Sequence, residues 1–307
     1  MAHSAKFLAL HDGSRAWLYV WQPKGRPKAV VQIIHGMAEH AGRYGRFARE
    51  LNAAGYAVVA QDLPGHGRTA AGPEQLGVVA SEDPFRSMLS AINHVRAHIE
   101  GHHPGLPLIL FGHSMGSFLA QRHVVEHGDG LAGCVLSATT GSLGPMRHLG
   151  VVINRAHKSL FGPEHKSAVT AAMTFGAFNK KFAPTRTASD WLSRDPAEVD
   201  AYIADPYCGF RCSANLWLSL LQATARLTDG SALRRIPKAL PLLLISGDKD
   251  PVCEGEKGTG LLAAAYRRAG LKAELKIYPQ ARHELLNETN REQVIADLLS
   301  WMNAQLG

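Results

Sequence analysis

The chain has 307 residues, 46% of them hydrophobic, so it can form one large domain or a domain with a smaller insertion, and global disorder is excluded. Lysine and arginine total 33 against 26 acidic residues, a net charge of +7, but the basic residues are scattered. Because the sequence has no dense basic stripe and no nucleic-acid motif, we expect no nucleic-acid partner, while weak attraction to anionic lipid surfaces stays open. No apolar stretch is long enough to span a bilayer and the N-terminus lacks an apolar signal core, so we expect a cytoplasmic protein.

Apolar runs of strand length alternate with amphipathic, helical segments along most of the chain. The first two runs flank Asp12-Gly13, a strong hairpin signal, and Asp83-Pro84 is typical of a helix start. Near the C-terminus, Thr289 and Glu292 have the spacing of a capping box that opens the last helix. This alternation predicts an α/β fold with a mostly parallel sheet and helices on both faces. The predicted strands are 7–10, 16–21, 29–34, 56–60, 108–111, 131–136, 241–246 and 273–278.

The alternation breaks between about Thr139 and Phe210. This segment is helix-like, rich in methionine and aromatic residues, and has no clear strand. We therefore predict a core formed by 1–138 and 211–307, with residues 139–210 inserted as a helical cap. Ligands of α/β proteins bind at the carboxyl edge of the sheet, so some apolar side chains of the cap should face that edge.

The four cysteines are interpreted as structural thiols. Cys134 lies in a strand pattern as a small core residue, and a cytosolic setting argues against disulfides. Cys208 and Cys212 could meet on one helical face, but this spacing without a nearby histidine pair is poor evidence for a metal. We therefore expect no metal ion and no other cofactor.

The strand that starts at Leu108 runs directly into a helix through Gly112-His113-Ser114-Met115-Gly116. A sharp strand-to-helix turn holds its central residue in a strained conformation, and the flanking glycines let the backbones pass closely. The turn presents the Ser114 hydroxyl at the edge of the sheet, above a helix N-terminus that favours negative charge. The pattern predicts that Ser114 is a nucleophile.

A serine nucleophile needs a base, and the base needs an acid that orients it. His283 follows the last predicted strand and is the candidate base, and Asp250 follows the strand before it. The order Ser114, Asp250, His283 is that of the α/β-hydrolase elbow enzymes. Asp248 follows the same strand as Asp250 and is the alternative acid. His113 is expected to point away from the site and to have a packing role.

The tetrahedral intermediate of acyl transfer needs backbone N–H donors for its oxyanion. The amide of Met115, directly after the nucleophile, is the first candidate. The second should come from the loop after an early strand, and Met37 in His35-Gly36-Met37 lies at the right place.

The sequence resembles the monoacylglycerol lipase and lysophospholipase-type α/β-hydrolases over nearly its whole length. The resemblance implies that the acid is Asp250, which precedes Pro251-Val252-Cys253. Met37 and Ala38 stand where the family often has Gly or Ala, which implies a narrower acyl pocket. The matching stretches are HGMAEH (35–40), DLPGHG (62–67), GHSMG (112–116), SRDPAEVDAYIADP (193–206), GDKDPVC (247–253) and YPQARHELLNE (278–288).

The resemblance implies a serine carboxylic ester hydrolase that cleaves a lipid ester with one acyl chain, a monoacylglycerol or a lysophospholipid, through an acyl-enzyme on Ser114. A short-chain carboxylesterase, another acyl hydrolase or transferase, and a catalytically silent binding protein with this fold are the alternatives. Contact with a membrane or micelle surface stays open, and the sequence does not specify an oligomeric state.

Overall fold

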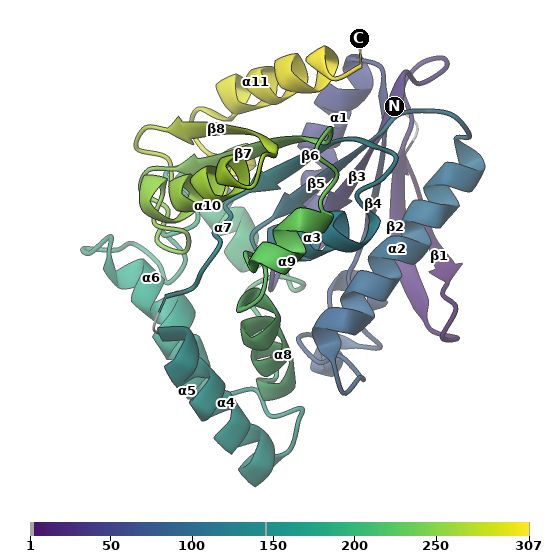
Figure 1. The fold of residues 1–307 in the computed structure, drawn as a ribbon. Coiled ribbons are helices and arrows are strands. Elements are labelled where there is room, and N and C mark those ends of the chain that lie inside the picture. The colour runs from purple at the N-terminus through teal and green to yellow at the C-terminus, as the bar shows by residue number, and fades with distance from the viewer. Residues whose placement is uncertain (1–2, 145, 307) are drawn as a thin grey trace.

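Eight strands form one sheet in the order β1-β2-β4-β3-β5-β6-β7-β8 (Figure 1). The computed structural model describes residues 3–144 and 146–306. Within them, β3 to β8 run parallel, and β1 and β2 form the expected antiparallel hairpin at one edge. The predicted α/β architecture is therefore confirmed. The strands are β1 (His3–Ala9), β2 (Arg15–Trp21), β3 (Ala29–Ile34), β4 (Tyr56–Gln61), β5 (Leu108–His113), β6 (Leu131–Ser137), β7 (Pro241–Gly247) and β8 (Lys272–Tyr278).

Helices cover both faces of this sheet, because successive side chains of each strand point to opposite faces. In β5, Leu108 and Leu110 pack against the face covered by α2, α3 and α10, whereas Ile109 and Phe111 pack against α1 and α11. All four side chains are buried, as expected for a central parallel strand. The helices are α1 (Gly45–Ala53), α2 (Pro84–His102), α3 (Met115–His127), α4 (Met146–Phe161), α5 (Ala168–Ala171), α6 (Ala177–Lys180), α7 (Pro196–Ala204), α8 (Ala214–Thr224), α9 (Gly230–Arg235), α10 (Glu256–Arg268) and α11 (Arg291–Ala304), with short turns η1 (Ala41–Tyr44), η2 (Gly67–Thr69), η3 (Pro73–Gln75), η4 (Ala172–Gly176, π-helical) and η5 (Leu285–Asn287).

The long connection from β6 to β7 carries α4 to α9, and none of its described residues forms a strand. Figure 1 shows α4, α5 and α6 as an arm that extends from the body of the molecule at the lower left. Helix α8 packs against both α4 and α2, so it joins this arm to the core. No helix among the described residues is long and apolar enough to cross a membrane.

Two local predictions are wrong. The N-cap of α11 is Asn290 without a side-chain cap, because the Thr289 amide and hydroxyl both donate to the Glu288 carboxylate instead of forming a capping box. Cys208 and Cys212 do not share a helical face either. Helix α7 ends at Ala204, and Asp205 is extended because the residue before Pro206 is sterically disfavoured in a helix.

Candidate active site

Ser114 occupies the turn between β5 and α3 with φ 52° and ψ −119°. This conformation is costly for a residue with a Cβ, and such strain is found mainly at functional sites. Gly112 and Gly116 make the turn sterically feasible, because a Cβ at either position would overlap a backbone carbonyl group. The local sequence therefore explains why the Ser114 side chain projects from the sheet edge.

Three side chains from distant parts of the sequence meet at this turn. His283 Nε2 lies 2.9 Å from Ser114 Oγ, and His283 Nδ1 lies 2.8 Å from Asp250 Oδ2. The Asp250 carboxylate also accepts the Val252 amide at 2.8 Å and the Cys253 thiol at 2.9 Å, so its orientation is fixed. Since β5, β7 and β8 are parallel, their carboxyl ends lie at one edge, which brings these loops together.

Asp248, the alternative acid, makes a different contact from Asp250. Asp248 pairs with its neighbour Lys249, with 3.6 Å between Oδ2 and Nζ, whereas Asp250 reaches His283. An imidazole that donates Nδ1–H to a carboxylate has its Nε2 lone pair directed at the serine hydroxyl. The arrangement can therefore remove a proton from Ser114 and return it to a leaving group.

The buried charges around His283 favour its protonated form. Burial alone would lower the pKa of His283, but the charge and hydrogen bond of Asp250 outweigh it, and the pKa lies above its ordinary value. Burial would raise the pKa of Asp250, yet His283 holds it below its usual range. His113 lies nearer to His283 than expected, with 5.0 Å between ring centroids, and burial lowers its pKa to about 4, so its ring is neutral.

The two predicted oxyanion donors belong to segments that border Ser114. Met115 is the first residue of α3, and Met37 lies in the loop that follows β3. Both line the same cavity as Ser114. The loop is tightly held, because the Gly36 amide donates to Glu39 Oε1 at 2.6 Å.

Ala38, at the centre of this loop, has φ +56°, which is unfavourable for a non-glycine residue. Its carbonyl oxygen accepts hydrogen bonds from the Tyr202 hydroxyl at 3.0 Å and from the Gly209 amide at 2.9 Å. The segment 202–209 therefore fixes the backbone next to Met37.

A buried ionic cluster behind the site was not predicted from the sequence. The Arg43 guanidinium donates to Glu39 Oε2 and to both oxygens of Glu284, each at 2.7 Å. All three side chains are largely buried, and Arg43 holds the pKa of Glu284 at about 2, although burial alone would raise it. Since Glu39 also bonds Gly36, and Glu284 directly follows His283, the cluster links the loop after β3 to the histidine loop. The i,i+4 spacing of Glu39 and Arg43 was visible in the sequence, but the partner 241 residues away was not.

Ser114 opens into a cavity of about 1450 Å³ between the arm and the sheet. Its walls are mainly apolar, with a few polar and charged side chains, among them Arg147 and Lys257. A large apolar cavity with a few convergent polar groups is typical of a lipid or small-molecule site. Apolar residues lining it include Ile153, Met173, Phe175, Trp217, Leu221 and Leu262.

The chain is similar to known hydrolases in sequence and in fold. Residues 25–290 match the hydrolase family described as serine aminopeptidase, S33. The chain is 31% identical to the monoacylglycerol lipase of Mycolicibacterium smegmatis, covering 96% of this chain and 95% of the relative. It is 32% identical to human monoglyceride lipase, and the match covers 90% of this chain and 82% of the relative. A thermostable carboxyl esterase from Bacillus coagulans superimposes with a TM-score of 0.92 at 26% identity over both full chains.

The chain belongs to this S33 family, and it is a serine hydrolase with the α/β-hydrolase fold. Within that class it is a monoacylglycerol lipase-like enzyme, a carboxylic ester hydrolase. The resemblance drawn from its motifs is thereby confirmed.

Proposed function

We propose that this enzyme hydrolyses lipid esters with one acyl chain, monoacylglycerols or lysophospholipids, through an acyl-enzyme on Ser114. The observation that carries the proposal is the 2.9 Å approach of Ser114 Oγ to His283 Nε2 beside an apolar cavity. The names of the relatives support the same substrate class.

In this mechanism His283 takes the Ser114 proton as Oγ attacks the ester carbonyl carbon. Asp250 holds the imidazole in the required tautomer and stabilises the imidazolium. The Met37 and Met115 amides donate to the carbonyl oxygen as it becomes negative. His283 then gives its proton to the departing alcohol oxygen, which leaves an acyl group on Ser114. A water molecule, deprotonated by His283, attacks this acyl group, and the fatty acid and free serine are released.

The segment 139–210 serves as a cap that encloses the acyl chain. Its residues Ile153, Met173 and Phe175 line the cavity. Burial of each methylene contributes about 0.8 kcal/mol, so a longer chain should gain transition-state binding until the cavity is filled. Exposed apolar side chains of the arm, among them Val152, Leu160 and Phe161, support contact with a membrane or micelle surface.

Labelling tests the nucleophile directly. A fluorophosphonate probe should modify the wild-type enzyme on Ser114, and Ser114→Ala should keep the fold while turnover falls about 10⁴- to 10⁶-fold. Circular dichroism checks the fold. An unlabelled, folded wild-type protein would instead identify a catalytically silent member of the family.

Acyl length tests the substrate class. At a fixed head group and below the critical micelle concentration, kcat/KM should rise from acetyl to decanoyl esters, and a flat or falling profile would indicate a short-chain esterase. Ile153→Trp, which adds bulk to the cavity wall, should shift the preference to shorter chains. Val152→Trp, at the adjacent exposed position, is the matched control. Peptide amides tested in parallel examine the activity that the family description suggests.

A further inference from the structure

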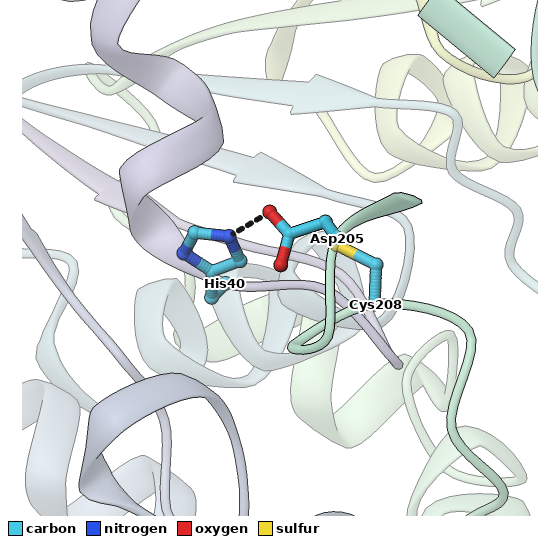
Figure 2. Close-up of side chains that lie close together, drawn as sticks. All are labelled: His40, Asp205 and Cys208. Atoms are coloured by element: carbon cyan, nitrogen blue, oxygen red, sulfur yellow. Dashed lines mark hydrogen bonds and ion pairs between the residues drawn. The ribbon is translucent and has the colours of Figure 1, made fainter. Parts of the chain in front are cut away.

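The turn Asp205-Pro206-Tyr207-Cys208, which follows α7, faces the end of the loop after β3. The Cys208 amide donates to the Asp205 carbonyl at 3.0 Å, and Asp205 Oδ1 accepts the Tyr207 amide at 2.8 Å. The closed turn thus brings the first and fourth side chains together, as metal-binding loops do for ligands of similar spacing. Figure 2 shows Asp205 and Cys208 beside the ring of His40.

These three side chains form a compact donor set. His40 Nε2 lies 2.9 Å from Asp205 Oδ2 (Figure 2), and one ligating atom from each of the three residues lies within 4.8 Å of the other two. Donors that share a tetrahedral zinc ion lie roughly 3.5 Å apart, as Zn–N, Zn–O and Zn–S bonds of about 2.0–2.3 Å require. Small side-chain rotations would therefore close the set around one ion.

We propose that His40, Asp205 and Cys208 form a binding site for a zinc-like divalent transition metal, with water in the fourth position. Imidazole and thiolate select zinc over magnesium or calcium, which prefer oxygen ligands. Asp205 Oδ1, bonded to the Tyr207 amide, keeps its orientation while Oδ2 turns to the metal. All three residues are partly exposed, so an ion can enter from solvent.

The chemistry of the donors makes binding dependent on pH. A thiol binds a metal as the thiolate, so Cys208 must lose its proton on binding. The metal must displace that proton and form an Sγ–metal bond, and one proton passes to the solvent. His40 must hold its own proton on Nδ1, so that the Nε2 lone pair is free. Nearby, Arg43 opposes the ion by its charge, but that charge is already paired with Glu39 and Glu284. Affinity should therefore rise with pH.

His40, Asp205 and Cys208 are not among the residues that line the cavity at Ser114, but His40 belongs to the loop that carries Met37. His40 ends the HGMAEH stretch, and the segment 202–209 already holds the Ala38 carbonyl. A bound ion would replace the direct His40–Asp205 hydrogen bond with metal–ligand bonds from both segments and would add Cys208 to the link. It should therefore raise the temperature of unfolding.

Cobalt(II) is the spectroscopic probe, used with the full chain after treatment with a chelator. Wild type should bind one equivalent with a sulfur-to-cobalt charge-transfer band, and zinc should displace the cobalt and raise Tm. Cys208→Ser, a nearly isosteric change, should abolish the band, whereas Cys212→Ser, four residues along, should retain it. His40→Gln should weaken cobalt affinity at least tenfold.

Three results would overturn the proposal: wild type without a charge-transfer band, a band that persists in Cys208→Ser, or unchanged cobalt affinity in His40→Gln. Cobalt bound elsewhere, by other histidines, would give no thiolate band and so would count against the site. Fluorophosphonate labelling of each variant verifies that its active site is still folded.

Discussion

Asp250 and Asp248 lie two residues apart after β7, yet only Asp250 contacts His283. We expect Asp250→Asn to lower kcat about 10⁴-fold, because an amide cannot hold the imidazole in the productive tautomer. Asp248→Asn, whose carboxylate pairs with the exposed Lys249, should stay within about twofold of wild type. The comparison is made with one soluble ester substrate. Equal losses in the two variants would contradict the assignment of Asp250.

Protonation of His283 should set the acidic limb of the pH profile. The base must be neutral, and its pKa lies above the ordinary value of 6.5, so kcat/KM should rise with pH through a pKa above 6.5. Asp250, Glu284 and Glu39 raise this pKa, and His113 is neutral. Glu284→Gln removes one negative charge and should move the limb to lower pH by several tenths of a unit, up to about one unit.

The exposed residue Glu292 provides a control for this prediction, since Glu292→Gln removes the same charge from the first turn of α11. Its profile should match that of wild type. If the Glu284→Gln limb stays in place while Tm falls, the buried ionic cluster has a structural role only.

At the scale of elements, the segment 202–209 holds the loop after β3. The Tyr202 hydroxyl donates to the Ala38 carbonyl and accepts the Gly209 amide at 3.1 Å. Tyr202→Phe should lower the free energy of unfolding by about 1 kcal/mol, because a buried hydrogen bond is lost. It should also lower kcat several-fold with little change in KM, since the neighbouring Met37 amide loses its fixed position.

Tyr207→Phe, in the same segment, is the control for Tyr202→Phe, and chemical denaturation and steady-state kinetics give the two quantities. A Tyr202→Phe enzyme with reduced stability but wild-type kcat would show that the loop keeps its position without this hydroxyl.

Elements whose signals are local were predictable from the sequence. Apolar runs predicted all eight strands, and glycine spacing predicted the turn at Ser114, because the alternation of side chains along a strand and the steric limits of a turn act over a few residues. Cap geometry was missed, since Glu288 competes for the Thr289 donors. The left-handed conformation of Ala38 and the pairing of Arg43 with Glu284 depend on contacts between distant segments, which neither periodicity nor propensity reports.

At the scale of the whole molecule, the net charge of +7 should assist approach to anionic lipid surfaces. With monoacylglycerol in vesicles that contain anionic lipid, the hydrolysis rate should fall several-fold when ionic strength rises from about 0.05 M to about 0.5 M, because screening shortens the range of attraction. Neutral vesicles should show little change. The same decline on both vesicles would indicate an effect of salt on the enzyme itself.

The order of the strands also bears on how the molecule is made. The turn at Ser114 is complete once β5 and α3 are synthesised, but His283, its proposed base, follows 169 residues later in the loop after the edge strand β8. Between these two residues, the chain must also form the long connection from β6 to β7, which carries α4 to α9. Contacts of such long range slow folding, and hydrolysis through this pair of residues should require that both have been synthesised and brought together. A nascent chain that has not yet reached His283 should carry Ser114 in place without its proposed base, so turnover in a translation mixture should report chains that have folded at least through His283.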